Sequence, residues 1–217
     1  PASIKLRKEL LSSGAKYIVS VFDENSGNDE RWHTGHHLQR ENYSLILEEL
    51  LRDEKLGVIF KPKTPLTLRK RLGDVSLLLD KAIETGRCKL LSESGQYTST
   101  TSPTLAALAS DLCIHGHLSA GTAALEAVLA GTPTLLIDRE MSVHSKLREL
   151  PKDKVRFDNW DEAIYAFRRY FKDKAMDKHF GNWESILDLL DPYRDGLGAQ
   201  RMGNYLNHII HSMNIGI

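Results

Sequence analysis

The chain has 217 residues, of which 41% are hydrophobic and 27% charged, as in an ordinary soluble globular protein. Its 29 basic and 29 acidic residues balance, which argues against a nucleic-acid partner bound through a general basic surface. No apolar run approaches the roughly 18 residues of a membrane span. The amino-terminal stretch PASIKLRKEL has neither an initial Met nor the apolar core of a signal peptide, so we expect a fragment of a longer protein.

Short apolar segments alternate with amphipathic ones along the chain. The apolar segments predict strands at residues 16–23, 57–63, 88–94, 111–116, 133–138 and 154–158. Helical spacing predicts helices at residues 41–53, 67–86, 102–110, 119–131 and 160–173, with Ser102 as an N-cap and Pro103 after it. This βαβα order predicts an α/β fold, a Rossmann-like parallel sheet of about six strands with helices on both faces. We expect one domain over residues 1–217, with 182–217 as a helical carboxyl-terminal extension.

The stretch HGHLSAGTAALEAVLAGTPTLLID, residues 115–138, is the least generic part of the chain. It passes from a strand into a helix at the edge where open α/β sheets bind ligands. The helix start offers N–H groups to a phosphate, Gly121 permits close backbone approach, and Ser119 and Thr122 add hydroxyl donors. Glu126 lies on the same helical face as Thr122 and could accept hydrogen bonds from ribose hydroxyls. Phosphate and ribose together indicate a nucleotide.

The same residues also have a simpler interpretation. Ser119 or Thr122 is then only an N-cap, Gly121 a packing site, and Glu126 a solvated or capping carboxylate. Spacing alone leaves the nucleotide site and the packing motif both open.

Other polar groups offer weaker signals. His115 and His117 are either functional groups or ordinary loop and core histidines. The loop at residues 24–37 is the longest polar interruption and the expected place for mobility or ligand contact. Its histidines, with Asp29 and Glu30, lack the spacing of a helical metal site, so no metal is expected.

A run of basic residues and the absence of two known motifs bear on which kinds of phosphate or nucleotide site the chain could have. Arg69, Lys70 and Arg71 point in different directions on a predicted helix, so we expect a solvated face there and no shared phosphate clamp. The chain has no Walker A motif and no G-x-G-x-x-G, which gives no support to a P-loop NTPase or a dinucleotide dehydrogenase.

The stretch SAGTAALEAVLAGTPTLLID resembles the nucleotide-binding motif in the C-terminal domain of GT-B fold glycosyltransferases. Members often carry a Ser/Gly-rich helix entrance, then a Glu-Ala pair, then Gly-x-Pro before the next strand. The matching residues here are Ser119, Gly121 and Thr122, then Glu126-Ala127, then Gly131-Thr132-Pro133. In that superfamily the helix start faces the donor phosphate and the glutamate holds the ribose hydroxyls, and a catalytic metal is generally not needed.

Two further segments are similar to related transferases. VIFKPK stands where these enzymes often have Lys-x-His-Pro near the donor phosphate; here Lys61-Pro62-Lys63 has no histidine, which puts any histidine-dependent role in doubt. RDGLGAQRMGNYL resembles the Asp-Gly…Arg pattern of CDP-glycerol glycerophosphotransferase-like and capsule-type transferases. Its matching residues are Asp195, Gly196, Ala199 and Arg201.

The resemblance implies the donor-binding half of a GT-B glycosyltransferase that moves a sugar from a nucleotide-activated donor to a glycan acceptor in bacterial surface polysaccharide synthesis. The expected donor-binding residues are Lys61, His117, Ser119, Gly121, Thr122 and Glu126. The N-terminal half, which usually carries the catalytic base, would lie outside this chain, so the catalytic residues stay unassigned. A sugar-nucleotide epimerase of the same fold and a non-catalytic module of a polysaccharide synthase are the alternatives.

The two cysteines bear on the cellular compartment in which the protein is located. Cys88 and Cys113 lie singly in apolar segments, which fits two reduced thiols in the cytoplasm better than a disulfide framework. Any attachment to the inner face of a membrane would come from parts of the protein outside this chain.

Overall fold

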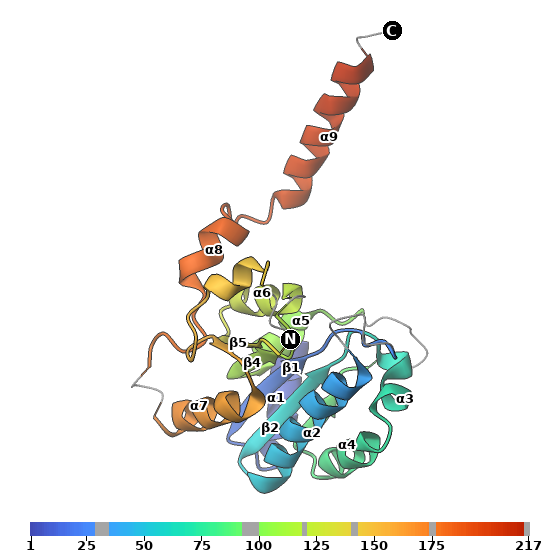
Figure 1. Cartoon of the computed structure of the whole chain (residues 1–217), viewed down its shortest axis with the longest axis vertical. Helices are drawn as coiled ribbons and strands as arrows, with labels where there is room; N and C mark the ends of the chain where they lie inside the picture. The colour runs from blue at the N-terminus through green and yellow to red at the C-terminus, as the bar shows by residue number, and fades with distance from the viewer. Residues whose placement is uncertain (29–34, 93–99, 119–120, 140–142, 174–176, 215–217) are drawn as a thin grey trace. The chain divides into compact units, whose positions relative to one another are not determined.

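The computed structural model describes residues 1–28, 35–92, 100–118, 121–139, 143–173 and 177–214. The chain divides into two compact units, residues 1–183 and 184–217. The larger unit is an α/β domain built on a six-stranded, all-parallel sheet (Figure 1). The predicted fold class is therefore confirmed.

The strands wind outward from the middle of the sheet. They are β1 (Tyr17–Phe22), β2 (Leu56–Lys61), β3 (Cys88–Leu90), β4 (Leu112–His115), β5 (Thr134–Ile137) and β6 (Arg156–Phe157). Their order across the sheet is β3-β2-β1-β4-β5-β6. The direction of winding reverses between β1 and β4, where Val19 pairs with Leu112. In a doubly wound sheet, ligands bind at this switch point, outside the carboxyl ends of the strands.

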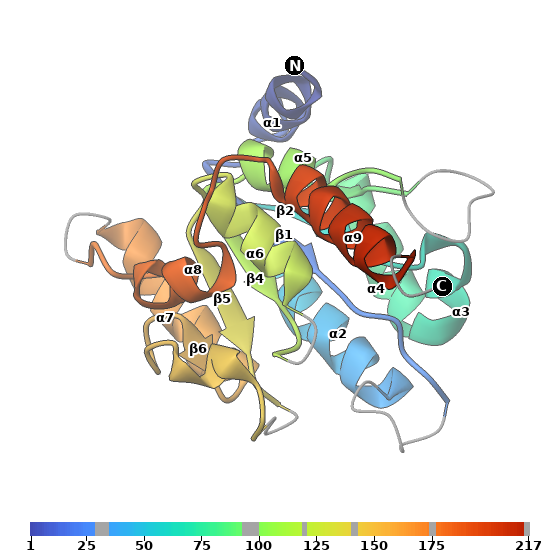
Figure 2. The ribbon, with the colours of Figure 1, turned by 90° about the horizontal axis from the view of Figure 1, so that it is seen from above.

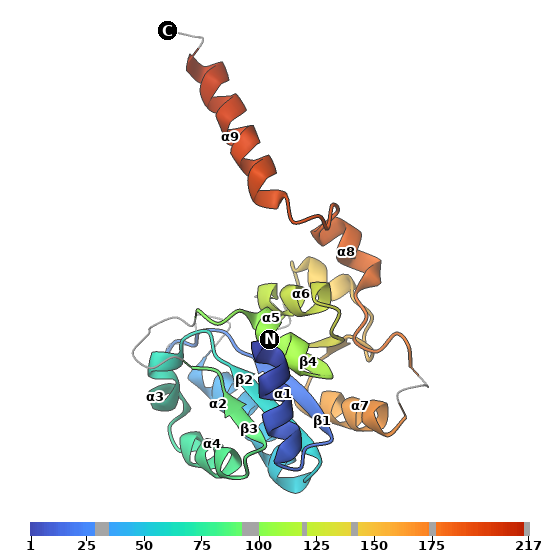
Figure 3. The same cartoon turned by 180° about the vertical axis from the view of Figure 1, so that it is seen from behind.

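Helices cover both faces of the sheet. One face carries α1 (Ala2–Ser12), α5 (Pro103–Ala109) and α6 (Thr122–Leu129) (Figures 2 and 3). The other carries α2 (His36–Arg52), α3 (Leu68–Leu72), α4 (Val75–Glu84) and α7 (Trp160–Lys172) (Figure 1). Successive side chains of a strand point to opposite faces, so Val19 and Val21 pack into one core while Ile18 and Phe22 pack into the other. This explains why the strands have apolar residues at nearly every position.

The predicted helix at residues 67–86 is wrong in one respect, because the chain forms α3 and α4 in its place. Gly73, between them, has a φ of 57°, in the left-handed region where a helix of L-residues does not continue. The apolar spacing runs through both helices and therefore conceals the break.

Two helix starts also differ from the prediction. α1 was not predicted; its N-cap position is Pro1, which provides no capping side chain, so the usual start signal is missing. α2 begins at His36, ahead of the predicted residue 41, so the polar loop after β1 is shorter than expected. Residues 29–34 of that loop lie outside the described part of the chain.

The smaller unit is helical, as predicted for the carboxyl-terminal stretch, and contains α8 (Glu184–Leu190) and α9 (Gly198–Asn214). The Asp-Gly…Arg pattern forms local structure within it. The Asp195 carboxylate accepts a hydrogen bond from the Leu197 N–H at 3.0 Å and pairs with Arg201, whose guanidinium lies 3.8 Å from the centre of the Tyr193 ring. Within the described ranges, no helix combines the length and apolarity needed to cross a membrane.

Candidate functional site

A cavity of about 130 Å³ lies at the carboxyl edge of the sheet, beside the switch point. We call it the carboxyl-edge cavity. It is lined by Phe22, Asp23, Glu24, Lys61, Lys63, Pro103, Thr122, Ala123 and Glu126. Its volume is below the roughly 300–1,000 Å³ of sites that enclose a whole drug-sized ligand, so it suits one phosphate or sugar group of a larger ligand.

Three of the predicted donor-binding residues, Lys61, Thr122 and Glu126, line this cavity. They come from the end of β2 and from the first turns of α6, which the parallel sheet brings to the same edge. Ser119 lies outside the described residues. Gly121 and His117 are not among the lining residues.

Lys61 is the last residue of β2 and is only 8% exposed. Its Nζ lies 3.5 Å from the carbonyl oxygen of Pro62. Pro62 has no N–H to continue the hydrogen-bond ladder with the neighbouring strand. The strand therefore ends at Lys61, which lines the cavity. Lys63, two residues on, also lines the cavity and pairs with both carboxylate oxygens of Glu24, at 2.9 and 2.6 Å.

Glu126 accepts hydrogen bonds from hydroxyl groups. Its Oε2 lies 3.2 Å from Oγ of Ser102, just before α5, and 3.4 Å from Oγ1 of Thr104 on α5. Ser102 is also the N-cap of α5, as predicted, since its Oγ accepts from the Thr104 N–H at 3.1 Å. The Glu126 carboxylate thus lies in an environment of hydroxyl donors at the mouth of the cavity.

The start of α6 combines features of both interpretations drawn from the sequence. Gly121, not Thr122, is the N-cap, and it has no side chain to accept from the first-turn N–H groups. A Cβ at Gly121 would lie 2.5 Å from Cδ1 of Leu147, so this glycine makes room for a packed side chain. The absence of a Cβ here favours the packing interpretation of Gly121, whereas Thr122 faces the cavity.

His117 lies in a buried polar network. It is 2% exposed, and its Nε2 lies 3.4 Å from Nδ2 of Asn42 on α2. Asn42 Oδ1 in turn accepts from the indole N–H of Trp160 at 2.7 Å. His115 Nδ1 lies 2.7 Å from the carbonyl oxygen of His117. This is the environment of a core histidine, and a donor-binding role for His117 stays a prediction.

Asp23 lines the cavity; from the sequence it was one of four residues after the first strand, Asp23, Glu24, Asn25 and Ser26, that either contact sugar or phosphate or form a solvated loop. It directly follows β1 and is 7% exposed. Its Oδ1 accepts from the Lys63 N–H at 2.6 Å; its Oδ2 accepts from Gln39 Nε2 at 2.9 Å and from the Tyr43 hydroxyl at 3.0 Å. Burial raises the pKa of this carboxyl, and the hydrogen bond from Lys63 and the charge of Arg71 oppose the rise.

The prediction that Arg71 lies on a solvated helix face is wrong. Its side chain is 5% exposed and donates to Gln39 Oε1 at 2.8 Å, to Ser26 Oγ at 3.2 Å and to the Thr64 carbonyl at 2.7 Å. Arg71 shares the inward face of α3 with Leu68 and Leu72, at the i, i+3, i+4 spacing. That spacing was the available signal, but the run of three basic residues concealed it.

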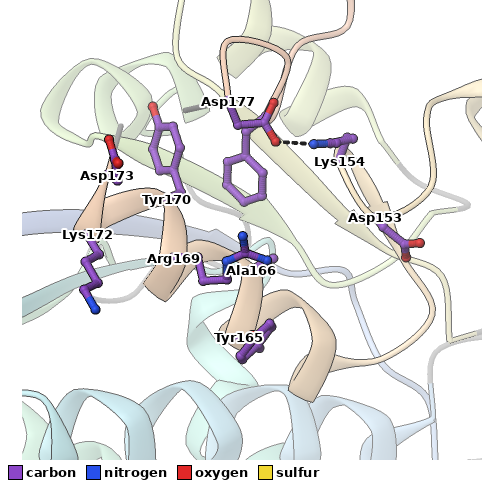
Figure 4. A pocket seen from close by; sticks show the side chains of 10 residues that line it. Asp153, Lys154, Tyr165, Ala166, Arg169, Tyr170, Lys172, Asp173 and Asp177 are labelled. Atoms are coloured by element: carbon purple, nitrogen blue, oxygen red, sulfur yellow. Dashed lines mark hydrogen bonds and ion pairs between the residues drawn. The ribbon is translucent and has the colours of Figure 1, made fainter. Parts of the chain in front are cut away.

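A second cavity, of about 600 Å³, lies against the segment before β6 and the second half of α7 (Figure 4). We call it the amino-edge cavity, because that segment leads into the amino end of β6. Its lining residues are Asp153, Lys154, Tyr165, Ala166, Arg169, Tyr170, Lys172, Asp173, Asp177 and Phe180. The rings of Tyr170 and Phe180 stack at 4.7 Å, and Lys154 pairs with Asp177. From the sequence, the mixed-charge stretch FRRYFKDKAMDKH, residues 167–179, predicts only a surface helix end.

The described residues give little support for metal binding or for a cysteine nucleophile. Within the described ranges, no group of three His, Cys, Asp or Glu side chains could hold a metal ion. Cys88 and Cys113 are buried and form no disulfide, and burial raises the pKa of the Cys88 thiol to about 12. A thiol with so high a pKa is not a nucleophile at neutral pH.

Comparisons of the chain with protein-family models, with curated proteins and with solved structures gave no match. The fold and the two cavities are therefore the observations from which a function is inferred.

Proposed function

We propose that the chain is the donor-binding domain of a GT-B type glycosyltransferase, which takes a nucleotide-activated sugar as donor in bacterial surface polysaccharide synthesis. The observation that carries the proposal is that Lys61, Thr122 and Glu126 meet around one cavity at the switch point of the sheet. The doubly wound strand order and the Glu-Ala…Gly-x-Pro pattern of residues 126–133 support it.

The phosphate end of the donor would lie at the start of α6. There the first-turn N–H groups carry the positive end of the helix dipole, and Thr122 lines the cavity. Lys61 lies across from them at the end of β2 and would supply a point charge. Together these groups would stabilise the negative charge that develops on the leaving phosphate when the sugar is transferred.

The ribose would lie against Glu126. Its carboxylate already accepts from the hydroxyls of Ser102 and Thr104, which is the type of contact that a ribose 2′- or 3′-hydroxyl makes with a carboxylate. The one-turn separation of Thr122 and Glu126 on α6 matches the order of phosphate and ribose in a nucleotide.

The rest of the reaction would depend on parts outside this chain. An N-terminal GT-B half would bind the glycan acceptor and supply the catalytic base. No metal cofactor is proposed, because the leaving phosphate would be stabilised by Lys61 and the start of α6. The buried thiols of Cys88 and Cys113 support a location in the reducing cytoplasm.

A thermal-shift screen tests this proposal. The full chain is heated with UDP, UMP, CMP, CDP or GDP, since a ligand that binds only the folded state raises the Tm. We expect a rise with one of these nucleotides, reduced in Glu126→Ala and retained in Glu48→Ala, a matched exposed glutamate on α2. No rise with any nucleotide at millimolar concentration, or an equal rise in Glu126→Ala, would contradict it.

A further inference from the structure

We propose that Asp23 and Arg71 are positioning residues that hold the turn at residues 61–64 against the carboxyl-edge cavity. This inference rests on the proposed function, because that function gives the lysines of the turn their ligand. The turn connects β2 to the short 3-10 helix Pro65–Thr67 that precedes α3, and the pairing of β2 with β1 ends at Lys61. Something other than secondary structure must therefore fix its backbone.

Asp23 holds the turn by accepting a hydrogen bond from one of the turn's backbone N–H groups. The Lys63 N–H donates to Asp23 Oδ1 at 2.6 Å, across from the end of the neighbouring strand β1. A carboxylate acceptor makes this bond stronger than a bond between neutral groups. It fixes the peptide between Pro62 and Lys63, and with it the direction in which both lysines of the turn leave the backbone.

Arg71 holds the same turn by donating a hydrogen bond to one of the turn's backbone carbonyl groups. Its Nη2 donates to the Thr64 carbonyl at 2.7 Å, and Thr64 is 2% exposed. The guanidinium also lowers the pKa of Asp23 against the effect of burial, so the two charges act on each other as well as on the turn. The turn is thus held at one N–H by Asp23 and at one C=O by Arg71, two buried side chains.

The contacts of Asp23 are those of a supporting residue. Both oxygens already receive hydrogen bonds: Oδ1 from Lys63, and Oδ2 from Gln39 and Tyr43. Gln39 in turn accepts from Arg71 at 2.8 Å, which connects the two positioning residues through one amide. The side chains of this network thus hydrogen-bond to one another as well as to the turn, as expected of groups that fix the geometry of a site.

The test measures the turn and the ligand separately. Hydrogen–deuterium exchange of the Lys63 amide reports the turn without any ligand, and the Kd for UDP, CDP and GDP reports the site. We expect Asp23→Ala to speed exchange at Lys63 by at least about tenfold and to weaken nucleotide binding by at least about tenfold. Asp23→Asn keeps an oxygen for the Lys63 N–H, so it should restore part of both. Asp80→Asn removes only an exposed pair with Arg69 and is the matched control.

Each outcome decides a different point. Unchanged exchange of the Lys63 amide in folded Asp23→Ala overturns the positioning role, whatever the ligand result. Faster exchange with unchanged affinity also overturns it, because the turn would then not matter for binding. If the wild type binds no nucleotide, the proposed function fails, and the exchange measurement still decides whether the pair holds the turn. If Asp23→Ala does not fold, the same readouts are taken on Asp23→Asn, where an exchange rate and affinity equal to those of the wild type count against the proposal.

Discussion

The carboxyl-edge cavity measures about 130 Å³ and the amino-edge cavity about 600 Å³, yet the smaller one is lined by buried charged side chains, Asp23 and Lys61. Around the smaller cavity, Asp23 is 7% exposed, Lys61 8%, and each contacts the backbone of the turn after β2. At the larger one, Tyr165 is 63% exposed, and the side chains of Lys154 and Asp177 pair in solvent. Binding groups need neighbours that lock them in place, so the comparison teaches that volume alone is a poor guide to a site.

Among the variants that test this difference between the two cavities, we expect Arg71→Leu to have the largest effect, which is on the free energy of unfolding. The change leaves a buried carboxylate and the Thr64 carbonyl without their cation, which should lower the free energy of unfolding by about 3–5 kcal/mol. Urea denaturation measures it. Arg69→Leu on the same helix, where the arginine pairs with Asp80 at an exposed site, should cost less than about 1 kcal/mol. Equal losses in the two variants would contradict the role of the buried network.

Glu126→Ala is expected to have the next largest effect, on nucleotide affinity. Loss of a charged hydrogen-bond partner should weaken binding by about 1–3 kcal/mol, measured by isothermal titration calorimetry. Tyr165→Ala in the amino-edge cavity should leave the affinity unchanged. The comparison between the cavities fails if the tyrosine variant loses affinity and the glutamate variant does not.

The pH dependence of stability provides a third test. Burial raises the pKa of Asp23 above its ordinary value of 3.8, so between that value and the raised pKa the folded state binds more protons than the unfolded state. The stability of the wild type relative to Asp23→Asn should therefore fall as the pH rises from about 4, by no more than about 1.4 kcal/mol per pH unit. Denaturation of both proteins across pH 4–8 measures this relative stability, and a relative stability of the wild type that rises with pH would contradict the raised pKa of Asp23.

Asp80 offers a control of the opposite sign. Its hydrogen bond with Arg69 lowers the pKa of Asp80, so its contribution to stability is present above the ordinary pKa and is lost as the pH falls. Asp80→Asn should therefore reduce or remove this acid-side loss.

The smallest effect is expected at the amino-edge cavity. Lys154→Ala breaks an ion pair with Asp177 in which the lysine side chain is 49% and the aspartate side chain 26% exposed. Exposed pairs contribute about 0.2–1 kcal/mol, less at high salt, so the Tm should change by only a few degrees. A much larger loss would mean that this cavity also has a rigid support.

The sequence was sufficient to predict the sheet, because buried parallel strands leave short apolar runs with helices between them. It also predicted Ser102 as a cap and Lys61, Thr122 and Glu126 as neighbours, since the carboxyl ends of parallel strands meet at one edge. It could not predict that Asp23 and Arg71, which lie 48 residues apart, are connected through Gln39. That connection depends on the partners that each side chain meets in three dimensions, which residue spacing does not give.

The measurement that tests the central claim most directly is ¹H–¹⁵N chemical-shift mapping of the full chain during titration with the nucleotide that raises the Tm most. We predict that the amides of Thr122, Ala123 and Lys63 shift first and saturate with the Kd found by calorimetry. Shifts confined to residues 165–172 of the amino-edge cavity, with none at the start of α6, would contradict the account.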